Sequence, residues 1–451
     1  MKRSVTGLRH GALAMGIFIV GLFQQNTFAA SKCPCDIYKD GGTPCVAAHS
    51  LVRSLYGTYD GPLYQVRLKS DTTKKKDIYP TVPGGYANAA AVDSFFKGTT
   101  GGTVSKIYDQ SEKKNHLTVS EWGSARSYRM RETPATHFKD TLSGHPVYPL
   151  YTDTGEGYRN DHTSGVATGA QMEGMYCVVR GGNHPKRTAD QSDCCWDYGN
   201  AESDASSAGK KTGVMEALYF GSKCWFTPCN GNGPWFFADL EWGLFQATAQ
   251  NGTTNVSIPY EYASGYLKGD VKTYTLRAGD ATKDVLTLLG TTNRPAPNIL
   301  TGAIVLGIGG DSAPSGWGTF FEGAMTIGRP SDTTEEAVQK NIGLVYSGKD
   351  TISTGVVVHR VFEASTSTTV AHYNQSTASA YIGYYLPEAG RVHLNVFDQR
   401  GRSVATLVNH VVPAGYQRAV WDAGRVAPGI YFWKIMVDGK ENGAGRIVVG
   451  K

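Results

Sequence analysis

The sequence predicts an all-β protein in which a large β-sandwich or jelly roll is followed by a second, smaller β-sandwich. Charged residues make up only 18% of the 451 residues, whereas aromatic residues reach 11% and glycine occupies 55 positions. This composition lacks the charged helices of coiled coils and helical repeats, and it is rich in residues that strands and turns use. Short apolar runs between glycine-rich turns also recur along the chain, which is typical of strands.

The first 29 residues are predicted to be a secretion signal. Three basic residues precede an apolar run of thirteen residues, 11–23, and small residues follow at Ala29 and Ala30. The run is shorter than the ~20 residues that a membrane-spanning helix needs, so a membrane anchor is the weaker alternative. Without those three basic residues the chain has 41 basic and 39 acidic residues. We therefore expect a secreted or cell-surface protein whose near-neutral charge gives no electrostatic reason to bind nucleic acid.

From residue 30 to residue 348 the pattern predicts one large β domain. Strand-length apolar runs occupy 213–220, 235–240 and 303–308, each with turn residues on both sides. Helical patterns are few, notably over 45–56 and 333–346. Many short strands with few helices favour a sandwich or jelly roll.

A segment rich in serine and threonine, 349–369, is predicted to be a linker to a smaller module over 370–451. Apolar runs separated by turns recur in that module, at 381–386, 392–397, 404–408, 429–435 and 445–449. Roughly seven short strands in about 75 residues are typical of a small Ig-like sandwich. Because no catalytic constellation stands out in it, we expect an accessory module.

Cysteine usage agrees with export. The eight cysteines are Cys33, Cys35, Cys45, Cys177, Cys194, Cys195, Cys224 and Cys229. An even number in an exported chain favours disulfides over thiols. Short loops favour pairing Cys35 with Cys45 and Cys224 with Cys229, and the sequence leaves the other pairings open.

Cys194 and Cys195 are adjacent in the chain. Adjacent cysteines bond to each other only through a small strained ring, and strain is often found near functional sites. The alternative is that each of them bonds elsewhere. No paired C-x-x-C, H-E-x-x-H or EF-hand spacing occurs in the chain, so the sequence predicts no metal site.

Carboxylates beside aromatic residues suggest carbohydrate chemistry, because sugars present apolar faces with polar rims. In the segment 235–242, Asp239 and Glu241 lie two residues apart on a predicted strand and would face one cleft. A solvated strand edge is the alternative for such a pair. Asp311 ends a strand that runs into glycines at 307–310, which would place it at the rim of a site, or in an ordinary turn. A serine nucleophile has no support, since no G-x-S-x-G occurs, and a cysteine nucleophile has none, since the cysteines are expected to be in disulfides.

An ordered series of motifs covers residues 33–348. They are Cys35-Asp-Ile-Tyr, Thr43-Pro-Cys45-Val-Ala-Ala-His49-Ser, Ile107-Tyr-Asp-Gln-Ser, Asn115-His-Leu, Gly155-Glu-Gly-Tyr-Arg-Asn160, Glu173-Gly-Met-Tyr176, Cys194-Cys-Trp-Asp-Tyr-Gly-Asn-Ala-Glu202, Met215-Glu-Ala, Gly233-Pro-Trp235 through Glu241, Leu306-Gly-Ile-Gly-Gly-Asp311 and Gly318-Thr-Phe. Together they resemble the catalytic domain of α-L-arabinofuranosidase B, glycoside hydrolase family 54.

This resemblance implies a concanavalin-like β-sandwich that removes terminal α-L-arabinofuranosyl groups with retention of configuration. By the same resemblance Glu241 is the nucleophile and Asp311 the general acid/base. Asp239 and Gly310 match residues that hold the sugar. No cofactor is implied, because a carboxylate nucleophile needs none.

The resemblance also implies how the sugar is enclosed. Cys194 and Cys195 match a vicinal disulfide that packs against the arabinose, and Trp225 matches an aromatic wall. Trp242 stands where the family usually has asparagine, so one polar contact to the sugar would be either missing or replaced by stacking.

Residues from about 370 onward resemble the Ig-like C-terminal modules of bacterial secreted enzymes. The likeness is carried by Leu386-Pro-Glu-Ala-Gly390, Val396-Phe-Asp-Gln-Arg-Gly-Arg402, Trp421-Asp-Ala and Pro428-Gly-Ile-Tyr-Phe432. Such modules serve as sorting signals for type IX secretion or resemble hook-capping Ig repeats. We expect a sorting or anchoring role through a secretion or surface machinery, with sugar binding and a plain spacer as alternatives.

These expectations combine into a secreted, monomeric exo-α-L-arabinofuranosidase. Its partners would be plant cell-wall polysaccharides, namely arabinan, arabinoxylan and arabino-oligosaccharides. Two alternatives stay open on the sequence. One is a carbohydrate-binding protein that has lost turnover, and the other is a related glycosidase, a β-xylosidase or a galactofuranosidase.

Overall fold

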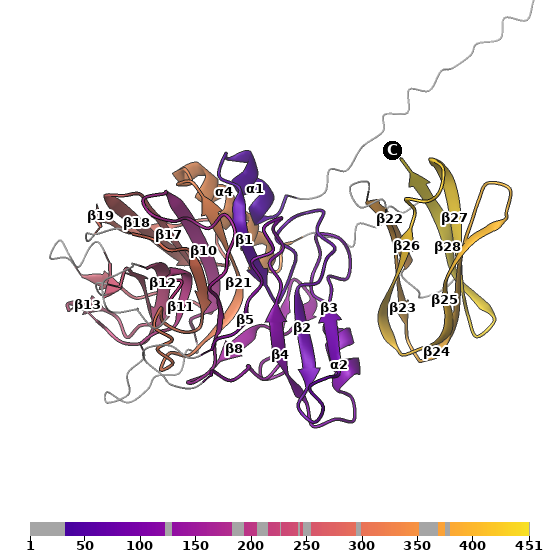
Figure 1. Cartoon of the computed structure of the whole chain (residues 1–451), viewed down its shortest axis with the longest axis horizontal. Helices are drawn as coiled ribbons and strands as arrows, with labels where there is room; N and C mark the ends of the chain where they lie inside the picture. Colours follow the sequence, from indigo (N-terminus) through magenta and orange to yellow (C-terminus); the bar gives the residue numbers. More distant parts are fainter. Residues whose placement is uncertain are drawn as a thin grey trace, which may run out of the picture. The chain divides into compact units, whose positions relative to one another are not determined.

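The computed structural model of the chain describes residues 32–121, 129–182, 194–204, 215–225, 227–241, 244–246, 254–294, 299–350, 369–374 and 379–450. Strands dominate these residues, which confirms the prediction of a mostly β protein (Figure 1). The predicted signal, 1–29, lies outside the described residues, as does nearly all of the predicted linker. Within the described part, no helix combines the length and the apolar character needed to cross a membrane.

The larger domain is organised around two seven-stranded antiparallel sheets. The first runs in the order β1-β21-β10-β17-β18-β19, with β8 also paired to β21. Its strands are β1 (Cys45–Ser50), β8 (Leu150–Thr152), β10 (Glu173–Arg180), β17 (Tyr262–Gly269), β18 (Thr273–Asp280), β19 (Thr287–Asn293) and β21 (Gly318–Ile327).

The second sheet runs in the order β15-β14-β12-β11-β20-β9-β5. Its strands are β5 (Thr118–Val119), β9 (Tyr158–Asn160), β11 (Asp197–Ala201), β12 (Glu216–Gly221), β14 (Trp235–Asp239), β15 (Leu244–Phe245) and β20 (Ala303–Leu306). The strands predicted over 213–220, 235–240 and 303–308 correspond to β12, β14 and β20.

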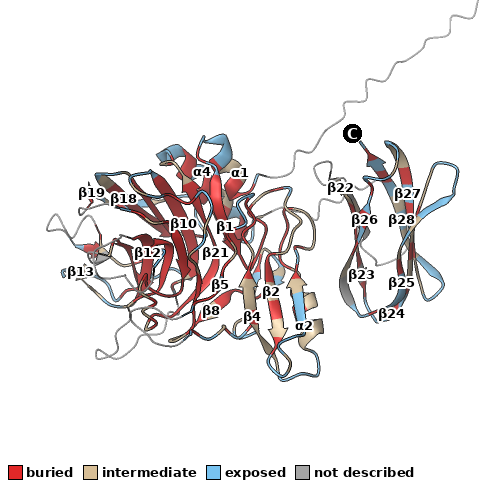
Figure 2. Cartoon of the chain, in the orientation of Figure 1, coloured by how far each residue is buried: buried red, intermediate tan, exposed pale blue. Residues whose placement is uncertain are grey.

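The two sheets share one apolar core. Met175 of β10 and Leu267 of β17 belong to the same buried cluster as Leu218 of β12 and Phe236 of β14. Both sheets are buried along most of their length (Figure 2). Side chains alternate along a strand, so neighbouring residues of the second sheet point away from this core. Tyr219, for example, belongs to a separate cluster on the other face.

Helices and smaller sheets surround this core. The described helices are α1 (Pro34–Asp40), α2 (Ala89–Phe96) and α4 (Asp332–Tyr346), and the small sheets are formed by β2 (Tyr64–Leu68), β3 (Lys75–Ile78) and β4 (Gly102–Ile107), by β6 (Asp140–Leu142) and β7 (His145–Val147), and by β13 (Cys229–Asn230) and β16 (Asn255–Val256). The helix predicted over 333–346 is confirmed as α4. It begins where the Ser331 side chain accepts a hydrogen bond from Thr334 N–H, and it buries Val338 and Ile342.

The helix predicted over 45–56 is wrong. Residues 45–50 form β1, and all six of them are buried. A strand with both faces covered lacks the alternation of polar and apolar residues, so its apolar run cannot be distinguished from a buried helix.

The C-terminal module has two sheets and a core of its own. They are formed by β22 (Thr369–Asn374), β23 (Ser379–Leu386) and β26 (Gly415–Asp422), and by β25 (Ser403–Val412), β24 (Gly390–Phe397), β27 (Gly429–Val437) and β28 (Lys440–Val449). Trp421, Leu394 and Ile435 belong to the cluster that these sheets enclose. Each of the five strands predicted in this module is present, and the Ig-like assignment stays a prediction.

Candidate active site

Asp239 and Glu241 lie where β14 leaves the second sheet. Asp239 is the last residue of the strand and is buried, whereas Glu241 is half-buried. The strand ends before Glu241, so simple alternation does not orient the two carboxyl groups as expected. Instead Glu241 takes a left-handed backbone conformation, with φ of 64°, and its N–H donates to Asp239 Oδ1 at 3.0 Å. A left-handed glutamate is uncommon and is held by its surroundings.

Asp311 reaches the same region from β20. The chain turns after this strand at Gly307, where φ is 79°, and Gly307 N–H donates to the carbonyl oxygen of Asp197 on β11 at 2.8 Å. The Asp311 carboxyl accepts a hydrogen bond from Ala313 N–H at 2.8 Å. A side chain at Gly309 would begin 3.3 Å from Cys195 Cβ and 3.4 Å from Asp311 Oδ1. The turn therefore places Asp311 beside the adjacent cysteines.

Electrostatic coupling shows that these groups share one site. The pKa of Asp239 is raised to about 7, mainly by burial and in part by the charges of Glu202 and Asp311, while the N–H of Glu241 acts to lower it. Burial, followed by the charges of Asp239, Glu241 and Asp311, raises the pKa of Asp197 well above its usual range. Five carboxyl groups from β11, β14 and the turn after β20 thus form one acidic cluster.

Asp197 and Glu202 are members of this cluster that the sequence did not single out as site residues. Asp197 is the first residue of β11 and is fully buried, and Glu202 directly follows the same strand and is 2% exposed. Burial raises the pKa of Glu202, and Arg159 opposes that shift. Both residues belong to the motif 194–202, so an available signal was the presence of two carboxylates in one segment that carries the family resemblance.

Gly310 sits against this cluster without room for a side chain. A Cβ here would lie 2.4 Å from Glu202 Oε2 and 2.7 Å from Met215 Sδ. The Gly310 carbonyl accepts a hydrogen bond from the buried Arg159 guanidinium at 2.5 Å, and the same guanidinium donates to the carbonyl of Glu202. Arg159 thereby ties the turn that carries Asp311 to the end of β11.

A wall of sulfur and aromatic rings borders the carboxyl groups. The structure bonds Cys194 to Cys195, and Cys195 packs with Tyr219, Trp235 and Phe237. Trp225 packs against this cluster, and its Nε1 donates to Tyr219 Oη at 3.0 Å. Trp242 lies outside the described residues.

Two further disulfides match the pairs that short loops favoured. Cys35 is bonded to Cys45, and Cys224 to Cys229, so the second of these bonds brackets Trp225. Cys33 and Cys177 are buried and take part in neither bond.

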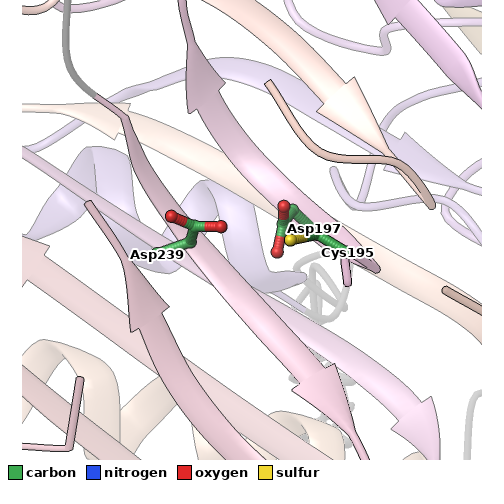
Figure 3. A group of neighbouring side chains, drawn as sticks. All are labelled: Cys195, Asp197 and Asp239. Carbon is green, nitrogen blue, oxygen red and sulfur yellow. The ribbon is translucent and has the colours of Figure 1, made fainter. Parts of the chain in front are cut away.

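Among the described residues, one group has the spacing of a metal site. A carboxyl oxygen of Asp197, one of Asp239 and Cys195 Sγ all lie within 4.8 Å of one another (Figure 3). The sulfur is already bonded to Cys194, so it has no thiolate to offer a metal. Only two carboxyl groups remain, which is fewer than the ligand sets of structural or catalytic zinc.

A polar hollow of about 680 Å³ lies beside the C-terminal end of β11, where Ser203 follows Glu202. Its lining is formed by Asp161, His162, Thr163, Gly165, Val166, Thr168, Gln171, Ser203 and Thr301. It contains none of the five clustered carboxyl groups, so the candidate active site remains the acidic cluster and its wall.

Comparison with known proteins gives a consistent result. The sequence model of the family described as "Alpha-L-arabinofuranosidase B, catalytic" matches residues 34–347. A curated relative, a probable alpha-L-arabinofuranosidase B of Aspergillus fumigatus, is 42% identical over 336 residues, which are 72% of this chain and 64% of the relative. The chain therefore spans a little less than two thirds of the length of that relative.

Two solved structures are also similar. A GH54 α-L-arabinofuranosidase soaked with a cyclic sulfate inhibitor matches with a TM-score of 0.64 and 34% identity, covering 79% of this chain and 73% of that one. An arabinofuranosidase complexed with arabinofuranosyl-α-1,2-xylobiose matches with a TM-score of 0.61 and 32% identity, covering 84% and 81%.

Proposed function

The chain belongs to the α-L-arabinofuranosidase B catalytic family, and from this premise we propose that it is a secreted, retaining exo-α-L-arabinofuranosidase. The observation that carries the proposal is the convergence of Glu241 and Asp311 on one buried acidic cluster, since both charges act on Asp197. A retaining glycosidase needs two carboxyl groups, roughly 5–5.5 Å apart, on either side of the scissile bond.

In the first step Glu241 acts as the nucleophile. Its carboxylate attacks the anomeric carbon of the arabinofuranosyl group and forms a covalent glycosyl-enzyme ester. Asp311, as the neutral acid, gives its proton to the glycosidic oxygen while the bond from that oxygen to the anomeric carbon breaks. The alcohol leaves, and Asp311 remains as a carboxylate.

In the second step Asp311 acts as the base. It removes a proton from a water molecule whose oxygen attacks the anomeric carbon, and the bond to Glu241 breaks. Glu241 returns to the carboxylate, Asp311 to the acid, and the sugar leaves with the configuration it had. Both steps use side chains alone, in keeping with the expectation of no cofactor.

Asp239, Gly310 and the wall hold the sugar in this proposal. The Asp239 carboxyl accepts a hydrogen bond from a sugar hydroxyl, and the backbone of Gly310 lies close to the ring because no side chain intervenes. The Cys194–Cys195 disulfide offers an apolar surface to the carbon face of the arabinose, with Trp225 beside it.

We propose arabinan, arabinoxylan and arabino-oligosaccharides as substrates. The complex of a 32% identical arabinofuranosidase with arabinofuranosyl-α-1,2-xylobiose supports this class. The C-terminal module, with its own core, is proposed to sort or anchor the enzyme during export rather than to take part in the reaction.

The proposal is tested by the release of 4-nitrophenol from the α-L-arabinofuranoside, the β-D-xyloside and the β-D-galactofuranoside. We expect the arabinofuranoside to react fastest, and Glu241→Gln to lower kcat by at least about 10³-fold. Asp311→Asn is expected to impair an arabino-oligosaccharide far more than the nitrophenyl substrate, because 4-nitrophenolate leaves without a proton.

The control is Glu336→Gln, which removes an exposed carboxylate on α4 and should leave kcat unchanged. Faster hydrolysis of the xyloside or galactofuranoside would refute the substrate class. Binding of arabinose without any turnover would refute the enzyme and favour a carbohydrate-binding protein.

A further inference from the structure

Asp197 is a buried carboxyl group for which the two-carboxylate reaction has no use. It begins β11, its side chain has no exposed surface, and neither carboxyl oxygen has a hydrogen-bond donor among the described residues. Its carboxyl group faces that of Asp239, and the two groups have oxygens within 4.8 Å of each other, beside the sulfur of Cys195 (Figure 3). An ionised carboxylate that is buried without hydrogen-bond donors would lower the free energy of unfolding.

The groups that act on Asp197 do not neutralise it. Asp239 at the end of β14, Glu241 beyond that strand and Asp311 after β20 are all acidic. Tyr219, opposite Asp197 on β12, has a hydroxyl that accepts a hydrogen bond from Trp225. Two carboxyl groups so close in a buried place cannot both be ionised, so the pair holds a proton.

We propose that Asp197 is a positioning residue, which as a neutral carboxylic acid donates a hydrogen bond to Asp239 and so fixes the backbone of the nucleophile Glu241. The chain of contacts continues through Asp239 Oδ1, which accepts the N–H of Glu241 at 3.0 Å. Glu241 needs this support because its φ is 64°. The inference rests on the proposed role of Glu241.

The pKa directions agree with this placement of the proton. Burial raises the pKa of Asp197 well above its usual range, whereas the pKa of Asp239 is raised to about 7 and a hydrogen bond from Asp197 lowers it. Asp197 therefore keeps its proton when Asp239 has lost its own. Asp239 then carries the single negative charge of the pair and can accept hydrogen bonds from both the peptide N–H and the sugar.

The test uses the full chain with Asp197→Asn and Asp197→Leu, assayed on 4-nitrophenyl α-L-arabinofuranoside. The amide of the new asparagine still donates to Asp239, so the kcat of Asp197→Asn is expected to stay within about threefold of the wild type. Leucine fills a similar volume but donates nothing, and we expect kcat to fall at least about tenfold because the nucleophile is misplaced.

A matched control is Glu173→Gln, which changes another fully buried carboxyl of raised pKa. The carboxyl of Glu173 accepts hydrogen bonds from the Asn200 amide at 3.1 Å, away from the acidic cluster. We expect this variant to keep the wild-type kcat. Thermal melting of each variant shows that it is folded under the assay conditions.

Infrared spectra at pH 7 report the proton without relying on activity. The wild type minus Asp197→Asn difference should contain the carbonyl stretch of a protonated carboxylic acid. Equal losses of kcat in Asp197→Asn and Asp197→Leu, full activity in Asp197→Leu, or the absence of that band would each overturn the proposal. A wild type that does not hydrolyse the glycoside would refute the proposed function and, with it, the positioning role, while the band would still locate the proton.

Discussion

The acidic cluster brings five carboxyl groups together, which lowers the free energy of unfolding. A function at this site explains why such a cluster is present. Three of the five groups, Asp197, Asp239 and Glu202, are at most 6% exposed, and burial is the largest cause of the raised pKa of each. Such a cluster opposes folding at a pH where its members ionise. Replacing one of these carboxyl groups with a neutral side chain should therefore raise the free energy of unfolding and lower the rate of the proposed reaction.

Asp239→Asn separates these two effects. The folded-state pKa of Asp239 is about 7, above the value of an unfolded aspartate near 4, so the stability it contributes is present below pH 4 and is lost as the pH rises through 7. The asparagine has no proton to lose. We expect the variant to exceed the wild type in unfolding free energy at pH 8, by at most about 4 kcal/mol, and to have little advantage at pH 4.

Chemical denaturation at pH 4, 6 and 8 measures this difference. The same variant should be less active, because the amide no longer offers an anionic acceptor to the sugar. A stability gain that is equal at all three pH values would show that Asp239 does not titrate in this range.

At the scale of single residues, the sequence predicted the groups that its motifs carry and missed those that depend on the three-dimensional surroundings. Asp239 and Asp311 stood out beside aromatic residues and glycines, and the structure brings them together. Asp197 and Glu202 were not selected, because only the central place of β11 in the sheet shows that they are buried beside the others. The backbone conformation of Glu241 is likewise set by contacts that strand alternation does not describe.

Among the elements, the turn after β20 determines where Asp311, the proposed acid/base, lies. Arg159 of β9 holds the carbonyl groups of Gly310 and Glu202, so this turn is tied to two strands of the second sheet. The strand itself was predictable from its apolar run between turn residues. The helix predicted over 45–56 failed because a fully buried strand has no alternating pattern to reveal it.

Gly310→Ala tests this turn. A methyl group would begin 2.4 Å from Glu202 Oε2, so the turn and the acidic cluster must shift, and we expect kcat to fall about tenfold or more. Gly429→Ala is the control, because among the described residues, its own chain neighbours aside, no atom lies within 4 Å of the new methyl group. Steady-state rates on the nitrophenyl arabinofuranoside measure both, and an unchanged kcat in Gly310→Ala would show that the turn tolerates displacement.

At the scale of the whole molecule, the described residues of the C-terminal module form an apolar core separate from that of the two large sheets. The cluster of the C-terminal module contains only residues from 380 onward, and the shared core of the two large sheets contains none of them. Separate cores are typical of separate domains. The accessory role of the module, expected because its sequence shows no catalytic constellation, stays a prediction.

Deletion of residues 370–451 is expected to leave kcat/KM on the nitrophenyl arabinofuranoside within about twofold of the full chain, because the reaction needs no group from that module. Secretion or surface retention in the producing cell should be lost. A tenfold loss of kcat/KM with a folded catalytic domain would instead assign the module a part in the site.

The proposed retaining mechanism, with Glu241 as its nucleophile, is tested most directly by proton NMR. The spectra follow the first sugar that the mature chain releases from 4-nitrophenyl α-L-arabinofuranoside, with Glu241→Gln as the control. We expect the wild type to release the α-anomer first, before mutarotation, and Glu241→Gln to release no sugar at a comparable rate. Initial release of the β-anomer, or full activity in Glu241→Gln, would contradict a retaining mechanism with Glu241 as its nucleophile.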